Sequence, residues 1–266
     1  MVVEGLTLTA VPAPTTDLEQ ARADLHASGI AVLRDALDVD ALASVRAATY
    51  GAAADDRRLG RRVKFEPDSD DTNQRVWNLP SRGRVFLDLV EHPLALTFVR
   101  ETIGWPALLS NISANITGPG GGEMVLHADQ TYMPQPWSGV QGVNVLWCVD
   151  AFTDANGATR VVPGSHLLNR VPGPSDQDVP TLPLEAPAGA MVVMEGRVWH
   201  RTGNNRTVEE TRAGIFAWYT PPIYLPQENW WLSPDPGIAD SGSDNLLVLF
   251  GYRVGGFGRV NGVSPR

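Results

Sequence analysis

From about residue 108 onward, short apolar runs alternate with clusters of glycine, proline, asparagine and aspartate. Apolar runs of about four to eight residues between turn residues are typical of strands. Many such strands in succession indicate a sandwich or a closed barrel. We therefore predict strands in the segments NISANITG, GEMVLHADQTYM, GVNVLWCVDAF, ATRVVPGSH, GAMVVMEGRVWH, AGIFAWYTP and NLLVLFGYRV.

Before this region, the apolar residues recur at helical spacing. Residues 16–28 are predicted as a helix that Thr16 or Asp17 caps and Gly29 ends. A short strand, IAVLR, and a second helix, DVDALASVRAATYGAA, follow. The segment RVFLDLVEHPLALTFVRETIG is predicted as helix with a break near Pro93.

The chain is predicted to form one domain. Nothing between residues 1 and 266 looks like a linker, and no repeat is visible. We expect a mainly β fold with flanking helices, in which a helical layer over about residues 16–107 supports a β core over about residues 108–255. Residues 55–75, which are rich in charge, are predicted to be irregular.

The charge balance restricts the partners. The net charge is −9, which argues against nucleic acid, because that affinity depends on lysine and arginine at phosphates. One basic run precedes the acidic EPDSDD and is either a solvated loop or a lid over an anionic substrate; it comprises Arg57, Arg58, Arg61, Arg62 and Lys64.

Other features favour a cytoplasmic protein, and we further expect a monomer or homodimer that acts on a small molecule. Cys148 is the only cysteine, so no disulfide can form within the chain, and a reducing compartment fits. The first residues lack the pattern of a signal peptide, and no apolar stretch is long enough to cross a membrane. The glycine-rich GPGGG is read as a turn, because no G-K-[ST] follows it.

The segment LHADQTYMPQPW contains the first candidate for chemistry. In a strand, residues two apart project from one face, so His127 and Asp129 can reach one point. A third ligand would come from a neighbouring strand, where His200 is the candidate and His166 the competitor. The alternative is that these are polar residues on the outer face of a strand.

An arginine follows His200 by twelve residues. If RVWHRT and TRAGIFAWY form an antiparallel hairpin, Arg212 lies opposite His200 and could hold a carboxylate beside the metal. Two histidines and a carboxylate are the ligands of non-haem Fe(II) oxygenases. Zinc hydrolases can also use two histidines and a carboxylate, so both classes stay open.

The combined motifs HAD, NGATRVVPGSH and WHRTGNNRTVEETR resemble the phytanoyl-CoA dioxygenase-like family of Fe(II)/2-oxoglutarate oxygenases. SGIAVLRDAL and GAMVVMEG fit the same family, and the likeness covers roughly residues 17–255. The resemblance implies a double-stranded β-helix, or jelly-roll, core. It implies that Fe(II), 2-oxoglutarate and O2 are the cofactors, with iron bound by His127, Asp129 and His200.

The resemblance also suggests the residues that bind 2-oxoglutarate. Arg212 would pair with its distal carboxylate, Thr159 would hydrogen-bond the same end, and Arg75 would help to hold the proximal carboxylate. Many members carry glutamine two residues before the first ligand, where this chain has Val125. Halogenases of the family replace the carboxylate ligand by a small residue. Asp129 therefore favours oxygenation.

The predicted activity is oxidation, most simply hydroxylation, of a small or medium-sized, largely apolar metabolite in natural-product biosynthesis, with release of succinate and CO2. Gln130, Tyr132, Trp218 and Tyr224 are the candidate substrate contacts, with strand or core packing as the alternative for each. A zinc hydrolase on a cupin-like barrel and a non-catalytic jelly-roll binding module are the rival classes.

Overall fold

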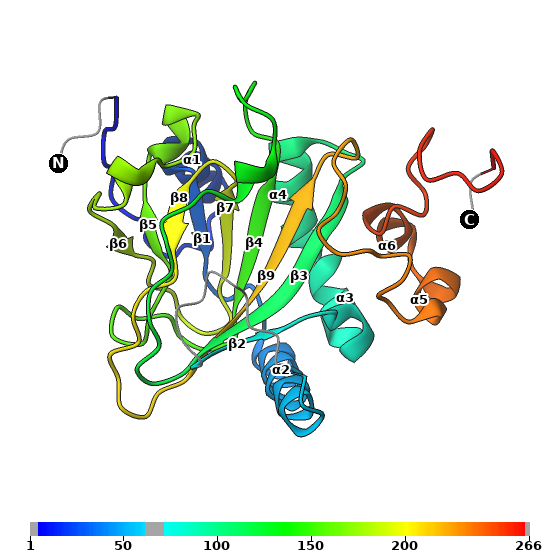
Figure 1. Ribbon diagram of the computed structural model, residues 1–266, viewed down its shortest axis with the longest axis horizontal. Helices are drawn as coiled ribbons and strands as arrows, with labels where there is room; N and C mark the ends of the chain where they lie inside the picture. The colour runs from blue at the N-terminus through cyan, green and yellow to red at the C-terminus, as the bar shows by residue number, and fades with distance from the viewer. Residues whose placement is uncertain (1–4, 62–71, 264–266) are drawn as a thin grey trace.

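The computed structural model describes residues 5–61 and 72–263. Two antiparallel sheets form its core (Figure 1). The larger has the order β1-β7-β4-β9-β3-β2 and the smaller the order β6-β5-β8. The strands are β1 (Ile30–Leu33), β2 (Asn73–Val76), β3 (Leu108–Thr117), β4 (Val143–Cys148), β5 (Arg160–Val162), β6 (Leu182–Pro183), β7 (Met191–Glu195), β8 (Trp199–Arg201) and β9 (Arg212–Thr220). The predicted mainly β fold with a jelly-roll core is confirmed.

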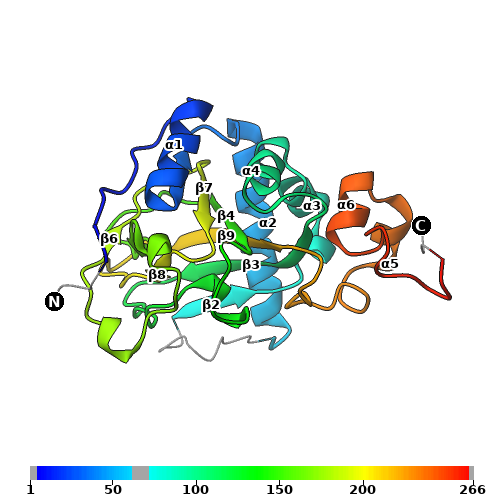
Figure 2. The same cartoon turned by 90° about the horizontal axis from the view of Figure 1, so that it is seen from above.

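Helices from the first half of the chain pack against the larger sheet (Figure 2). The Asp17 side chain caps the first of them by accepting hydrogen bonds from two backbone N–H groups. Gly29 ends that helix in the left-handed conformation, with φ +79°. The predicted break at Pro93 is confirmed, since a new helix begins there. The four helices are α1 (Leu18–Ser28), α2 (Val39–Arg58), α3 (Arg84–Val90) and α4 (Pro93–Ile103).

Successive side chains of a strand point to opposite faces of the sheet, and this divides the interior into two layers. On β4, Val145 and Trp147 belong to the apolar cluster shared with the helices. Leu146 and Cys148 point the other way, into a cluster shared with the smaller sheet. The opposite faces of the larger sheet therefore bury different side chains, and the inner face, which looks toward the smaller sheet, can hold a cavity.

The predicted last strand is wrong. The first half of NLLVLFGYRV belongs to helix α6 (Asp244–Leu249). This helix follows helix α5 (Pro236–Ser241) at the right of Figure 1. The Ser243 hydroxyl accepts a hydrogen bond from the Leu246 backbone N–H and so caps α6. A short apolar run does not distinguish helix from strand, and here the cap decides.

The strand predicted for GEMVLHADQTYM is also absent. In this segment, His127 forms a single antiparallel bridge with His200. A 3-10 turn, Asp129–Tyr132, begins two residues later. Asp129 is therefore placed by the start of a turn, and the same-face rule for strands does not apply to it.

The charged region is more regular than predicted. Helix α2 continues through Arg58, and strand β2 pairs with β3. Arg57 donates to Gln74, and Arg58 lies 3.1 Å from Asp55. Arg62 and Lys64 of the basic run lie outside the described residues. Among the helices of the described part, none has the length and apolar character that crossing a membrane requires.

Candidate metal centre

Three of the predicted residues converge on one point. The Asp129 Oδ1 atom lies 3.8 Å from His127 Nε2 and 3.6 Å from His200 Nε2. The candidate ligand atoms of the three residues all lie within 4.8 Å of one another. Within residues 5–61 and 72–263, this is the one such group of three histidine, cysteine or acidic residues.

The backbone brings the two histidines together. His127 and His200 exchange backbone hydrogen bonds of 3.0 and 2.8 Å, so their imidazoles stand side by side with centroids 4.3 Å apart. The Nδ1 atom of His127 lies 3.1 Å from the Val125 carbonyl, and that of His200 lies 3.0 Å from the Val198 carbonyl. Each Nδ1–H donates to its carbonyl, which leaves both Nε2 lone pairs toward Asp129.

The protonation state suits a metal ligand. Burial lowers the pKa of His127 to about 4, and the neighbouring His200 adds to this effect. A neutral imidazole can donate its lone pair to a cation, whereas a protonated one cannot.

Asn144 orients the carboxylate and was missed by the sequence reasoning. Its Nδ2 donates to Asp129 Oδ2 at 2.8 Å, which leaves Oδ1 for the histidines. Asn144 lies on β4, inside the apolar run VNVLWC. A lone polar residue in a buried strand was the available signal, because such a side chain needs a polar partner.

The predicted hairpin between the segments of His200 and Arg212 is wrong. Strand β8 pairs with β5 in the smaller sheet, whereas β9 lies between β3 and β4 in the larger one. The loop between β8 and β9 carries the chain from the smaller sheet to the larger one. Within this loop, Asn205 forms an isolated antiparallel bridge with Asn156. In the observed register, Arg212 lies opposite Thr117 of β3.

Arg212 is nevertheless a buried cation on the inner face of β9. Its Nη2 donates to Thr117 Oγ1 at 3.0 Å and to the Gly157 carbonyl at 2.5 Å. Its Nε and Nη1 are buried and have no hydrogen-bond partner among the described residues. Burial lowers the pKa of Arg212 to about 10, so the group is still charged at neutral pH. Two buried N–H donors without acceptors are costly and point to an anionic ligand.

A cavity is lined in part by His127, Asp129 and His200, which are called the triad below. Among the predicted residues, Arg75, Thr159, Tyr132 and Trp218 line it together with the triad. Arg75 lies opposite Asn115 in the pairing of β2 with β3. The cavity is also lined by side chains that the sequence reasoning missed: Asn111, Ser113, Asn115, Asn144, Thr202 and Phe216.

Two predicted substrate residues do not line this cavity. Gln130 is fully buried, donates to the Gly139 carbonyl at 2.9 Å and accepts from the Gln141 N–H at 2.8 Å, so it fixes a loop. Tyr224 donates to the Gln141 side chain and lines a separate cavity beside Trp230. Each side chain is thus directed to a structural partner, which favours the packing alternative for both residues.

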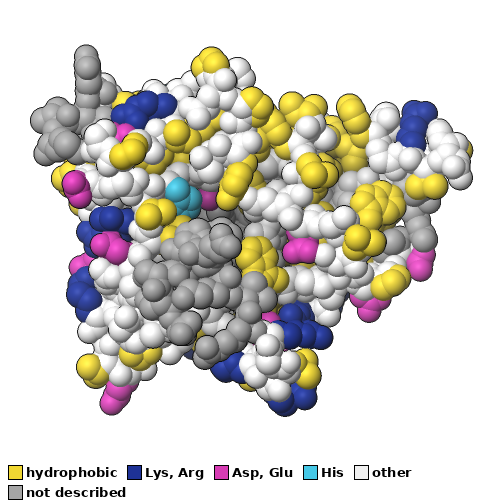
Figure 3. Space-filling model, in the orientation of Figure 1, with side chains coloured by type: hydrophobic (Ala, Val, Ile, Leu, Met, Phe, Trp, Pro, Cys, Tyr) yellow, Lys and Arg dark blue, Asp and Glu magenta, His cyan; other side chains and the backbone are white. Residues whose placement is uncertain are grey.

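The mouth of the triad cavity is partly apolar. Val125 is 60% exposed and Tyr132 is 70% exposed, and both line the cavity. Figure 3 shows a histidine side chain reaching the surface among hydrophobic side chains on this face. His166, the competing ligand, is buried elsewhere, with its Nε2 3.3 Å from the His26 carbonyl.

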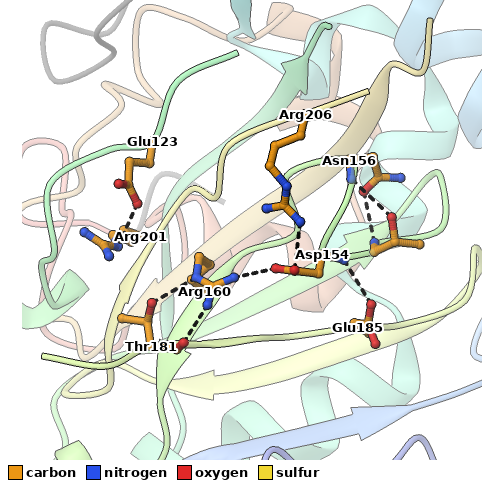
Figure 4. A network of polar contacts seen from close by, with 9 residues as sticks. Glu123, Asp154, Asn156, Arg160, Thr181, Glu185, Arg201 and Arg206 are labelled. Carbon is orange, nitrogen blue, oxygen red and sulfur yellow. Dashed lines mark hydrogen bonds and ion pairs between the residues drawn. The ribbon is translucent and has the colours of Figure 1, made fainter. Parts of the chain in front are cut away.

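A polar network holds the loops at the Arg212 end (Figure 4). Asp154 accepts from Arg160 and from Arg206, the latter at 2.8 Å. Arg160 also donates to Thr181 Oγ1 at 2.9 Å. Because Asp154 belongs to the turn that leads to Gly157, the network steadies the carbonyl that accepts from Arg212.

Two glycines make room for the Trp218 indole. A Cβ added at Gly142 would lie 2.2 Å from Trp218 Cη2, and one added at Gly196 would lie 2.5 Å from the same atom. Gly142→Ala is therefore expected to displace the indole and to lower the free energy of unfolding by about 1–3 kcal/mol, the usual cost of overpacking.

Urea denaturation and tryptophan fluorescence measure this effect. Gly51→Ala is the matched control, because nothing lies within 4 Å of its Cβ position in helix α2. It is expected to be neutral or to stabilise by roughly 0.5–1 kcal/mol. An unchanged Gly142→Ala protein would show that the indole is not confined.

The amino-acid sequence is similar to a known protein family and to curated relatives. Residues 25–214 match the model of the phytanoyl-CoA dioxygenase (PhyH) family. Dioxygenase af480 of Aspergillus fumigatus is 39% identical over 260 residues, which cover 91% of this chain and 81% of the relative.

Solved structures share the fold. The non-heme alpha ketoglutarate dependent epimerase SnoN from nogalamycin biosynthesis matches with TM-score 0.61 and 21% identity, over 86% of this chain and 92% of its own. HygX from Streptomyces hygroscopicus, solved with nickel and 2-oxoglutarate bound, matches with TM-score 0.62 and 16% identity, over 78% and 88%. The extent of the family match and the identity to a curated dioxygenase establish that the chain belongs to the phytanoyl-CoA dioxygenase (PhyH) family and is an oxidoreductase of the dioxygenase type.

Proposed function

We propose that this protein is an Fe(II)- and 2-oxoglutarate-dependent dioxygenase that hydroxylates a small or medium-sized, largely apolar metabolite. The observation that carries the proposal is the convergence of His127, Asp129 and His200 on one point. Two imidazoles and one carboxylate fit Fe(II) and leave coordination positions for a chelating acid and O2. The names of the structural neighbours, which include SnoN in complex with Fe3+ and alpha ketoglutarate, support the assignment.

The basic residues fit a dicarboxylate. Two buried donor nitrogens of Arg212, Nε and Nη1, have no hydrogen-bond partner among the described residues and would pair with the distal carboxylate of 2-oxoglutarate. Thr159, which lines the cavity, would place its hydroxyl at the same end. Arg75, which lines the cavity, would hold the proximal carboxylate. The charge on Arg75 contributes to the lowered pKa of Arg212, so the two cations repel each other. A dianion bound near both would offset this repulsion.

With iron and 2-oxoglutarate held by these residues, O2 would be the oxidant: one oxygen atom would enter the succinate that forms as 2-oxoglutarate loses CO2, and the other would enter the hydroxylated substrate. The protein contributes binding and orientation. Phe216 and Trp218 would form the apolar wall that holds a substrate C–H toward the triad. Asn144 keeps Asp129 turned toward the two histidines. Val125 adds an apolar side chain to the lining of the cavity.

We also propose that the helical layer and the β core act as one domain. They share a single hydrophobic cluster, to which Phe86 and Phe98 of the helices and Trp147 of the sheet belong. The natural-product context of SnoN supports a role in tailoring a specialised metabolite.

Anaerobic titration with Fe(II) and then with 2-oxoglutarate tests the proposal. The expected result is a weak visible charge-transfer band that forms only when both are present, with one equivalent of iron. A zinc hydrolase with the same ligands, or a binding module without metal, would give no such band. Its absence in the wild-type protein would contradict the proposed function.

A further inference from the structure

The inner face of the larger sheet presents a row of side chains to the cavity. Strand β9 lies between β3 and β4, and in the observed register Trp218 pairs with Asn111 on one side and with Asn144 on the other. All three side chains line the cavity that contains the triad. The next row, about 6.6–6.8 Å further along the strands, contains Ser113 and Phe216.

The amide of Asn144 has a fixed orientation. Its Nδ2 atom donates to Asp129 Oδ2 at 2.8 Å. Because an ionised carboxylate only accepts hydrogen bonds, the nitrogen must face Asp129 and the oxygen must face away. The Asn144 side chain is buried, with 6% of the residue exposed, and its Oδ1 has no hydrogen-bond partner among the described residues.

A second amide oxygen shares this property. The Oδ1 atom of Asn111 is also buried and has no partner within the described part of the chain. Asn111 and Asn144 lie two strand spacings apart, or about 9.6 Å between their backbones, with the Trp218 indole between their strands. A wholly apolar ligand would cover both oxygens without satisfying them, which is unfavourable for buried acceptors.

We propose that Asn144 and Asn111 form a substrate subsite that accepts hydrogen bonds from O–H or N–H groups carried by an apolar skeleton. The inference rests on the proposed function and narrows its substrate class from a largely apolar metabolite to one with such donors. The skeleton lies against Trp218 and Phe216, and a donor faces Asn144. Asn144 then contacts the substrate and Asp129 with the two ends of one amide, so it aligns the substrate with the metal ligand.

A matched pair of probes tests this subsite: 2,6-dihydroxynaphthalene and its dimethyl ether. Methylation removes both donors and keeps the aromatic skeleton. Binding is measured anaerobically by calorimetry on the protein loaded with Fe(II) and 2-oxoglutarate. The wild-type protein is expected to bind the diol at least about tenfold more tightly than the ether, as the loss of a buried hydrogen bond implies.

Variants show whether the preference for the diol comes from hydrogen bonding or from the larger size of the ether. Asn144→Leu and Asn111→Leu each remove one acceptor at similar volume and should each reduce the preference about fivefold. Asn111→Leu keeps the inference testable if Asn144→Leu disturbs Asp129 or the fold. Asn245→Leu is the control and should retain the wild-type preference, because Asn245 is a half-buried residue of helix α6 that accepts from Arg100 Nη2 at 3.0 Å and does not line the cavity.

An unchanged preference in Asn111→Leu and in folded Asn144→Leu would overturn the subsite, as would failure of the wild-type protein to bind either compound. The charge-transfer band is recorded in the same samples. If the band forms and the preference does not depend on the asparagines, only the subsite is wrong. If the wild-type protein gives no band, the proposed function is wrong and the subsite assignment falls with it.

Discussion

Replacing Arg212 by methionine is expected to weaken 2-oxoglutarate binding by about 100-fold or more, while Fe(II) binding changes by no more than about twofold. The guanidinium is fully buried and has two N–H donors left for an anion. Truncating one partner of a buried, charge-assisted pair costs about 2–5 kcal/mol, or roughly 30- to 4,000-fold in affinity, and the full burial of this guanidinium favours the upper part of that range. Titration of 2-oxoglutarate into the anaerobic Fe(II) protein measures it.

Arg84→Met is the matched control for this prediction. The Arg84 side chain is 61% exposed and pairs with Asp88 on the surface of helix α3, so its loss should change 2-oxoglutarate affinity very little. Arg212→Lys should recover only part of the binding, because an ammonium cannot present the planar fork of a guanidinium. If Arg212→Met bound 2-oxoglutarate like the wild-type protein, the guanidinium would not be the carboxylate partner.

Replacing Asp129 by alanine is expected to abolish turnover and to weaken Fe(II) binding by more than about 100-fold. Altering groups that only support a metal ligand typically costs about 10–100-fold, and loss of the ligand itself should cost more. Asn144→Leu provides this comparison, because Asn144 supports the ligand indirectly, by donating to Asp129 Oδ2. Its effect on Fe(II) affinity should lie within that smaller range.

Metal content after anaerobic loading and desalting checks the Asp129 prediction. Asp88→Ala is the control, since Asp88 is an exposed partner of Arg84 on helix α3. Near-wild-type iron content in Asp129→Ala would mean that the carboxylate is not a ligand.

The elements with strong local signals were predictable from sequence. Helix α1 has a capping aspartate before it and a left-handed glycine after it, and Pro93 begins α4. These signals act within a few residues, so the sequence displays them directly. The segment NLLVLFGYRV has a short apolar run that fits both a helix and a strand, and its capping residue, Ser243, lies before the run among other turn-forming residues.

The candidate site was predictable only in part, for a similar reason. His127 and Asp129 are close in sequence, so their convergence follows from local geometry, although a turn and not a strand produces it. Arg212 was placed by a hairpin that does not exist, because the chain changes sheets between β8 and β9. The contact of Asn144 with Asp129 depends on sheet register, which pairs residues far apart in the chain.

The central claim is that His127, Asp129 and His200 bind one iron ion in front of the Arg212 guanidinium. Crystals grown anaerobically with Fe(II) and 2-oxoglutarate test it through anomalous diffraction at the iron absorption edge. We predict one anomalous peak within bonding distance of the two Nε2 atoms and of Asp129 Oδ1, and a carboxylate of 2-oxoglutarate on Arg212. An iron-loaded crystal with no peak at these atoms, or with its peak at other side chains, would contradict the account.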